Sequence, residues 1–355
     1  MRIVDIAEAT FRFHQAVYVS LTEKCPIRCR HCFVESAPTR EEQADVAAFT
    51  RWIEGVAATP GLRVAFFSGG EPFSHPLALR AALQACRRHG VCGIVCTSGF
   101  FGKSDLSTER LLDAFPEIEC LYISTDPFHE EFVPLDWLRR VAQIADRRGI
   151  LVGFQVVDDD PENSPFMRRF GEIVGYDVVP RDRIVMVPLA KQGRAERELT
   201  AVEEAQVRRP QGHGLSAVSQ QPCAWLATPW IREDGVVSAC PNLGVFRASS
   251  HPLQLGNLND EKYEALAARS DDDPYIQGLR VFGPRWVAEH YPVDEWGWDR
   301  AAFKGSSICD LCHSLAGVPN LVENARAEAR RNGDLEKIDL LRLAIYHERR
   351  PGAIV

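Results

Sequence analysis

Between residues 16 and 190, short apolar runs alternate with longer amphipathic segments, and this alternation limits the possible fold more than any other feature. The apolar runs, rich in β-branched and aromatic residues, span 16–22, 63–70, 92–99, 120–126, 151–157 and 183–190. Continuous apolar runs of this length are typical of parallel strands buried on both faces. The intervening segments predict helices over 40–58, 76–90, 107–115 and 134–149.

Six strand–helix units predict a parallel sheet with right-handed crossovers. Because six units are too few to close an eight-stranded barrel, we expect an α/β fold, a partial (βα)6 TIM-like barrel over residues 1–200. In such sheets ligands bind at the carboxyl ends of the strands. Functional residues are therefore expected in the loops that follow the strands.

Three cysteines, Cys25, Cys29 and Cys32, directly follow the first predicted strand. The N-terminus carries Asp and Glu where a signal peptide would be basic and then apolar, which predicts a cytoplasmic protein whose eleven cysteines are reduced. Three thiolates can hold three irons of a [4Fe–4S] cluster and leave the fourth iron open. A zinc site that includes His31, or chance clustering, is the alternative.

The composition excludes some classes of partner. The net charge is −8, with both signs interspersed, so no basic surface for nucleic acid or a membrane is predicted. No apolar run approaches the length needed to span a bilayer.

A second motif, Ser68-Gly69-Gly70-Glu71-Pro72, follows the second predicted strand. Together with Cys25-x3-Cys29-x2-Cys32, it resembles the radical S-adenosylmethionine (radical SAM) enzymes. The resemblance implies that the open iron binds S-adenosylmethionine and that electron transfer cleaves it to a 5′-deoxyadenosyl radical. It also implies an external electron donor such as flavodoxin or ferredoxin.

The same resemblance implies which residues contact the cofactor. Gly69, Gly70, Glu71 and Pro72 would lie at the methionine amino group, Ser98 at its carboxylate or the ribose, and Ser124 and Asp126 elsewhere on the cofactor. Alternatively, these residues are ordinary turn and strand-end residues that do not bind a cofactor. His31 departs from the family pattern, which usually has an aromatic residue near adenine before the third cysteine.

Four further cysteines, Cys223, Cys240, Cys309 and Cys312, lie in the last third of the chain. Asp234-Gly235 predicts a hairpin turn that brings Cys223 close to Cys240. The set resembles the twitch form of SPASM auxiliary domains, which implies a second, fully ligated [4Fe–4S] cluster, and a zinc site with four cysteine ligands is the alternative. We expect a linker and this domain over residues 201–318, and a helical tail over 319–355.

A fully ligated auxiliary cluster can accept a second electron. The chain is therefore most similar to aminocyclitol dehydrogenases, which oxidise an alcohol of a small molecule to a ketone, and His129 is the candidate base for the hydroxyl proton. One alternative is a maturase that oxidises or crosslinks a ribosomally made peptide. Another is a redox-neutral epimerase, which would need a hydrogen-donating cysteine, whereas the remaining four (Cys86, Cys92, Cys96 and Cys120) are predicted to be buried. A non-catalytic iron–sulfur carrier would not need the second motif.

Arg194 lies in a Gly-Arg-Ala stretch that recurs after the sixth strand in twitch and SPASM enzymes. It could bind a carboxylate or phosphate with both nitrogens, or it could be a solvated arginine at the start of a helix.

Overall fold

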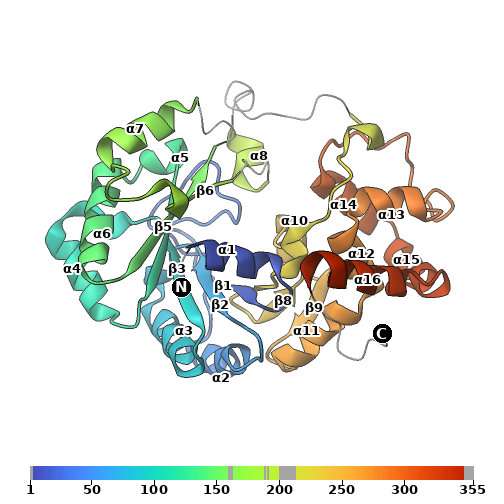
Figure 1. Cartoon of the computed structure of the whole chain (residues 1–355), viewed down its shortest axis with the longest axis horizontal. Helices are drawn as coiled ribbons and strands as arrows, with labels where there is room; N and C mark the ends of the chain where they lie inside the picture. Colours follow the sequence, from blue (N-terminus) through green and yellow to red (C-terminus); the bar gives the residue numbers. More distant parts are fainter. Residues whose placement is uncertain (1–2, 159–162, 188, 190–191, 200–212, 348–355) are drawn as a thin grey trace. The chain divides into compact units, whose positions relative to one another are not determined.

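A computed structural model describes residues 3–158, 163–187, 189, 192–199 and 213–347 (Figure 1). The chain divides into two compact units. The first comprises Met1–Ala9, Val17–Arg208 and Ile231–Gly235, and the second comprises Thr10–Ala16, Arg209–Trp230 and Val236–Val355. The domain boundaries expected near residues 200 and 318 stay predictions, since residues 200–212 lie outside the described part of the chain.

The first unit is built on a parallel sheet. Its strands are β1 (Ala16–Thr22), β2 (Val64–Gly69), β3 (Cys92–Thr97), β4 (Cys120–Thr125), β5 (Leu151–Val157) and β6 (Ile184–Val187). They lie side by side in chain order, and each pair from β2 to β6 is parallel. Repeated right-handed βα units produce this order. The predicted partial (βα)6 barrel is confirmed, and the carboxyl ends of its strands share one edge.

Several helices form an outer layer over this sheet (Figure 1). The helices of this part of the chain are α1 (Ile3–Phe11), α2 (Val46–Ala57), α3 (Pro76–His89), α4 (Asp105–Ala114), α5 (Pro127–Glu130), α6 (Leu135–Arg147), α7 (Pro165–Ile173) and α8 (Arg194–Glu198), with short 3-10 turns η1 (Pro72–Ser74), η2 (Phe100–Lys103) and η3 (Arg181–Arg183). Helix α1 lies on the other face, where a Cβ added at Gly153 would meet Ile3 and Tyr122. Helix α3 packs on β2 and β3, and α6 packs on β5.

The helix predicted over 40–58 begins later than expected. Asp45 caps α2, because its side chain accepts a hydrogen bond from the Ala48 amide. The residues before it pair with the end of β1 instead: the Glu23 amide donates to Glu42 O and the Ala44 amide donates to Leu21 O. These hydrogen bonds hold together the two ends of the segment that carries the three cysteines.

The two faces of the sheet have different neighbours because side chains alternate along a strand. On the inner face, Tyr18 stacks on Phe66 with ring centroids 4.3 Å apart, and Phe66 meets Tyr122 edge-on at 6.4 Å. On the outer face, a Cβ added at Gly93 would meet Leu83 of α3. The outer face therefore forms the apolar core under the helices.

The second unit contains short strands and a group of helices. They are β7 (Trp230–Ile231), β8 (Val236–Ser238) and β9 (Gln254–Asn257), the turns η4 (Leu215–Ala217) and η5 (Ala224–Ala227), and α10 (Leu243–Arg247), α11 (Tyr263–Asp272), α12 (Pro274–Val281), α13 (Pro284–His290), α14 (Ile308–Ala316), α15 (Leu321–Arg331) and α16 (Asp334–Tyr346). Helix α12 is central: all eight of its residues are buried, and α11, α13, α15 and α16 contact it.

The predicted hairpin is present in the second half of the chain. Strands β7 and β8 are neighbours in the sheet, and Gly235 in the turn between them has φ +87°, a conformation that favours glycine. The expected helical tail contains α15 and α16, whereas α10 to α14 were not predicted. Two of these, α10 and α13, have only five and seven residues, too few to show a helical period. No described helix is long and apolar enough to cross a membrane.

Candidate functional site

The loop after β1 carries the first three cysteines. Cys29 is buried, and Cys25 and Cys32 are half-buried. Burial raises the pKa of the Cys25 thiol, and Glu71, Cys32 and Cys29 raise it further because like charges lie near it. The three thiols and the Glu71 carboxylate therefore lie close enough to affect one another's ionisation.

The glycines after β2 permit a close approach of the chain to itself. The Gly70 amide donates to Thr22 O at 2.5 Å, and the Glu71 amide donates to Lys24 O at 2.9 Å. A Cβ at Gly69, whose φ is +116°, would overlap Thr22 O, and one at Gly70 would overlap Lys24 O. The glycines thus fasten the end of β2 to the backbone just before Cys25 and leave the Glu71 side chain beside the cysteine loop.

Glu71 carries a buried carboxylate whose two oxygens have different surroundings. The side chain is 1% exposed. Oε2 accepts hydrogen bonds from Thr97 Oγ1 at 3.0 Å, from the Ser98 amide at 3.1 Å and from Ser98 Oγ at 3.0 Å. Oε1 has no hydrogen-bond partner within the described residues. A buried oxygen without a partner is costly, so it marks a position where a ligand can donate.

Burial raises the pKa of Glu71 to about 7, against the opposing effect of the bonds from Ser98 and Thr97. A cationic donor at Oε1 would favour the ionised carboxylate and relieve this cost. Ser98, expected to contact the cofactor itself, donates through both its amide and its hydroxyl to Glu71. Its position makes it a support for that carboxylate.

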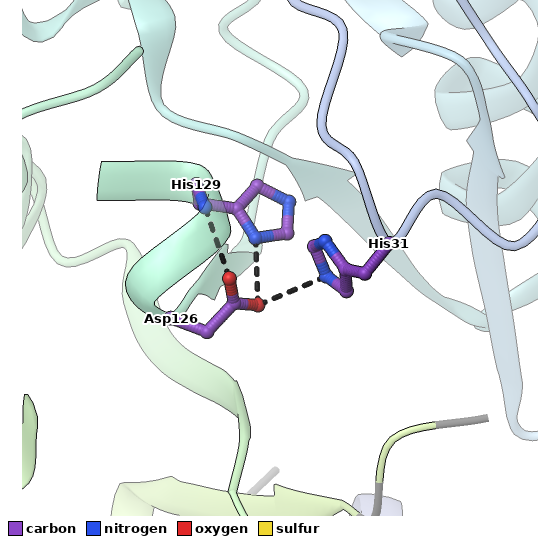
Figure 2. Close-up of side chains that lie close together, drawn as sticks. All are labelled: His31, Asp126 and His129. Carbon is purple, nitrogen blue, oxygen red and sulfur yellow. Dashed lines mark hydrogen bonds and ion pairs between the residues drawn. The ribbon is translucent and has the colours of Figure 1, made fainter. Parts of the chain in front are cut away.

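Asp126 follows β4 and holds two imidazoles, as Figure 2 shows. Its Oδ2 accepts from His129 Nδ1 at 2.7 Å and pairs with His31 Nε2 at 3.1 Å. Its Oδ1 caps α5 by accepting from the Phe128 and His129 amides, both at 2.9 Å. Asp126 is fully buried, so both of its carboxylate oxygens are bound within the protein.

The electrostatics of the cluster follow from this geometry. Burial alone would raise the pKa of Asp126, but His129 and His31 outweigh it and hold the pKa well below the usual range. Burial would lower the pKa of His129, but Asp126 and the Cys29 sulfur raise it well above the ordinary value. His129, the expected base, therefore lies between a carboxylate and a cysteine of the loop.

His31 lies against the ring of Phe128, with centroids 4.7 Å apart and an interplanar angle of 25°. Its Nδ1 is buried without a hydrogen-bond partner in the described part of the chain. Ligand atoms of His31, Asp126 and His129 lie within 4.8 Å of one another, which is close enough for a metal ion. The hydrogen bonds to Asp126 Oδ2 account for the same proximity without an ion.

The other expected residues lie at the same edge of the sheet. Pro72 is buried at the start of η1, and Ser124 is half-buried on β4, paired in register with Gln155 of β5. Of the cysteines predicted to be buried, Cys86 and Cys120 are, whereas Cys92 and Cys96 are half-buried on β3. Those two positions face the inner side of the sheet, which is less completely covered than the helix side.

Arg194 differs from the interpretation as a solvated arginine at the start of a helix. It is 3% exposed, and its guanidinium donates to two backbone carbonyls of the cysteine loop, those of Cys29 and Ser36. The only sequence signal was its position after Gly193, beyond the last strand of the barrel.

The second unit contains Cys223, Cys240, Cys309 and Cys312. Cys223 precedes η5, Cys240 follows β8, and Cys309 and Cys312 lie one turn apart on α14. All four line one cavity, together with His251 and His313. Burial raises the pKa of Cys312 well above its usual value, and the charges of the other three thiols raise it further. The four thiols therefore converge and could hold a zinc ion or an iron–sulfur cluster.

The arrangement in the first unit defines a class of protein. Three thiols, a buried carboxylate with one unsatisfied oxygen, and their position at the carboxyl edge of a partial βα barrel fit an iron–sulfur cluster with an amino-group-bearing cofactor beside it. Residues 19–177 match the family model described as the radical SAM superfamily. The matched segment is thus similar to a superfamily whose members use a [4Fe–4S] cluster and S-adenosylmethionine, and it covers somewhat less than half of this chain.

Individual relatives match different shares of this chain. The protein YydG of Bacillus subtilis (strain 168), provisionally named as a peptide biosynthesis protein, is 20% identical over 315 residues, which cover 85% of this chain and 92% of YydG. The GTP 3′,8-cyclase of Chlorobaculum tepidum is 29% identical over 132 residues, which cover 36% of this chain and 38% of the cyclase.

Among solved structures, anSMEcpe with bound AdoMet and the Cp18Cys peptide aligns with a TM-score of 0.50 at 11% identity, over 88% of this chain and 99% of that one. At this identity the alignment establishes a shared fold.

Proposed function

We propose that this protein is a radical SAM enzyme that modifies a peptide. The unsatisfied oxygen of Glu71 beside the three-cysteine loop carries the first part of the proposal, because it is a ready acceptor for the amino group of S-adenosylmethionine. The peptide is supported by YydG, which aligns over nearly its whole length with this chain. The small aminocyclitol-like substrate favoured by the sequence has no counterpart among the relatives described above.

Cys25, Cys29 and Cys32 would hold three irons of the catalytic cluster and leave one iron open. When bound there, the cluster would supply the electron that cleaves S-adenosylmethionine. The chain's own part is to bind and orient: Glu71 Oε1 accepts from the cofactor amino group, while Ser98 and Thr97 fix the carboxylate from the other side. A protein of the flavodoxin or ferredoxin class would be the electron donor.

His129 is better placed to orient the loop than to act as a base. Its Nδ1 donates to Asp126, and Asp126 and the Cys29 sulfur raise the pKa of the ring, which favours a protonated ring over one that accepts a proton. His31 and Asp126 complete this cluster. We therefore assign the three residues to the architecture of the cofactor site.

Cys223, Cys240, Cys309 and Cys312 would hold the second metal centre, as a [4Fe–4S] cluster with four protein ligands. Such a cluster could accept the second electron of a two-electron oxidation of the peptide. A zinc ion at the same four thiols would favour redox-neutral chemistry such as epimerisation.

The experiment begins with anaerobic reconstitution, iron and sulfide analysis, and a zinc assay on the same sample. The protein is then reduced with dithionite and incubated with S-adenosylmethionine and deuterium-labelled candidate peptides, with 5′-deoxyadenosine as the readout. Deuterium passing from labelled peptide into 5′-deoxyadenosine identifies the peptide as the substrate. With unlabelled peptide, loss of two hydrogen masses indicates oxidation, whereas an unchanged mass in H2O and a gain of one mass unit in D2O indicate epimerisation.

Two results would count against the proposal. If the reconstituted protein forms no 5′-deoxyadenosine while retaining its iron, the radical SAM activity is wrong. If 5′-deoxyadenosine forms but carries no label from the peptide, whereas a labelled aminocyclitol transfers deuterium, the substrate class is wrong. The Cys29→Ala variant is the background control for cleavage that does not depend on the cluster.

A further inference from the structure

Gly193 and Arg194 bind the cysteine loop through its backbone. Arg194 Nη1 donates to Cys29 O at 2.7 Å, Nη2 donates to Ser36 O at 2.5 Å, and the Arg194 amide donates to Cys32 O at 3.1 Å. Two of the three acceptors are carbonyls of cysteines. One buried arginine therefore connects the second and third cysteines to the far end of their loop.

The contact requires glycine at position 193. Gly193 has φ +62°, and a Cβ there would overlap Phe33 O and lie 2.9 Å from Cys32 O. Without the glycine, the segment after β6 could not lie directly on the loop backbone, and Arg194 could not reach its carbonyls. The Gly-Arg pair acts as one unit.

The charge of Arg194 has a different effect from its hydrogen bonds. The acceptors of its guanidinium bonds are neutral carbonyls, so the bonds themselves do not cancel its positive charge. Because Arg194 bonds to the carbonyls of both Cys29 and Cys32, this charge is held within the cysteine loop. When a neighbouring group can exist in two charge states, a buried positive charge favours the more negative one.

An iron–sulfur cluster held by three thiolates becomes more negative by one charge when it is reduced. Net charge and hydrogen bonding near the sulfurs are two of the factors that set the reduction potential of such a cluster. A fixed positive charge beside Cys32 would therefore make reduction easier. In a radical SAM enzyme, reduction is the step that precedes cleavage of S-adenosylmethionine.

We propose that Arg194 is a positioning residue of the catalytic cluster, which shapes the cysteine loop through three backbone hydrogen bonds and raises the reduction potential of the cluster through its charge. The proposal rests on the proposed function in one respect, namely that Cys25, Cys29 and Cys32 hold the cluster. Arg194 would thus have two effects on the cluster, one through its hydrogen bonds to the loop and one through its positive charge. Different substitutions can remove these effects one at a time.

Arg194→Gln removes the charge and at least one hydrogen bond, whereas Arg194→Lys keeps the charge but cannot donate to two divergent carbonyls as a planar guanidinium does. The matched control is Arg197→Gln, on the same helix, whose exposed side chain pairs with Glu35 of the same loop. Each full-length variant is reconstituted, and iron per chain and the midpoint potential are measured by titration followed by electron paramagnetic resonance. The catalytic cluster is the one whose spectrum changes when S-adenosylmethionine is added.

We expect Arg194→Gln to bind less iron at this cluster and to have a more negative midpoint potential. Arg194→Lys should recover the potential but not the full iron content, and Arg197→Gln should match the wild type in both. The proposal is overturned if Arg194→Gln has the potential and iron content of Arg197→Gln. Its charge component is overturned if Arg194→Lys shifts the potential as much as Arg194→Gln does.

If Arg194→Gln takes up no iron, Arg194→Lys decides the question of charge, and the circular dichroism melting curve decides the question of geometry. Loss of iron with an unchanged melting curve supports the positioning role, whereas general unfolding would mean that Arg194 only stabilises the fold. A wild-type protein without any signal that responds to S-adenosylmethionine would instead refute the proposed function, so the two failures are distinguishable.

Gly193→Ala tests the backbone contact alone, because it leaves the Arg194 side chain intact. We expect it to lower iron content as Arg194→Gln does. Gly55→Ala on α2, where an added Cβ has no atom within 4 Å, is the control for a glycine substitution without a clash. Normal iron content in Gly193→Ala would overturn the geometric part of the proposal.

Discussion

The two groups of cysteines differ in the atoms that surround them. Beside the three cysteines of the first unit lie buried polar atoms without partners among the described residues, including Glu71 Oε1 and His31 Nδ1. The four cysteines of the second unit line a cavity with mainly apolar neighbours, such as Leu226, Leu253 and Leu279. The first site offers acceptors for a ligand that donates hydrogen bonds, whereas the second offers four thiols among mainly apolar side chains.

This difference relates coordination number to chemical role. Three thiolates leave one coordination position open, and an open position is useful only if nearby groups orient what binds there. Four converging thiolates can complete a tetrahedral set, so the surrounding side chains need only exclude water. We therefore expect changes in the first unit to alter cofactor binding, and changes in the second to alter electron transfer or stability.

The largest expected effect comes from removing each set of thiols separately. The triple variant of Cys25, Cys29 and Cys32 to Ala should lose about four irons per chain and all reductive cleavage of S-adenosylmethionine. The double variant Cys309→Ala and Cys312→Ala should lose the second centre but still form 5′-deoxyadenosine. Iron, zinc and 5′-deoxyadenosine are measured on both variants and on the wild type. Equal loss of cleavage in both variants would show that the two sites do not differ in the way proposed.

The next effect concerns the carboxylate that distinguishes the first site. Glu71→Gln should weaken binding of S-adenosylmethionine by roughly ten- to a hundredfold, because a charge-assisted hydrogen bond is replaced by a neutral one. Calorimetry on the reconstituted protein measures the dissociation constant, and iron content serves as the control for an intact cluster. An unchanged dissociation constant would mean that the amino group binds elsewhere.

A smaller effect is the pH dependence of that binding. Since the pKa of Glu71 is raised to about 7 in the ligand-free protein, the carboxylate must lose a proton to accept from an ammonium group below that pH. We expect affinity for S-adenosylmethionine to fall by about tenfold per pH unit below 7. Glu71→Gln should have no such slope, and a wild-type slope that persists in this variant would assign the proton to another group.

The same pKa shift has the opposite sign for stability. A carboxyl whose folded pKa lies above its unfolded value of 4.5 favours the fold when it is protonated. Its contribution to the ligand-free protein is fully present below about 4.5 and is lost as the pH rises through about 7. Ligand binding and fold stability therefore place opposite demands on Glu71, as is common for functional residues.

The sequence was sufficient to predict the parts of this comparison that depend on local pattern. The spacing of Cys25, Cys29 and Cys32, the glycines before Glu71 and the hairpin turn at Asp234-Gly235 each carry their own signal, and the strand periodicity placed the first two at one edge. These features depend on neighbours within a few residues. A single sequence shows such features directly.

What the sequence could not show depends on contacts between residues far apart in the chain. Arg194 meets Cys29 across 165 positions, and His31 meets Asp126 through a pairing that no local pattern encodes. The roles of the glycines were also incompletely predicted, because the atoms that exclude a side chain at Gly69 and Gly70 belong to the end of β1 and the residues after it. Burial of a charged side chain is set by the tertiary fold, and a Gly-Arg-Ala stretch reads equally well as a solvated helix start.

The smallest effect we predict concerns the buried cluster of Asp126 with His31 and His129 beside the first site. In Asp126→Asn, one amide nitrogen replaces an oxygen that accepts hydrogen bonds, so at least one bond to the imidazoles or to α5 is lost. We expect the free energy of unfolding to fall by about 1–3 kcal/mol. Asp146→Asn, an exposed aspartate of α6, is the control. Chemical denaturation of the metal-free protein measures both variants, and equal stability of the two would show that the hydrogen bonds of Asp126 add nothing to the fold beyond what an amide provides.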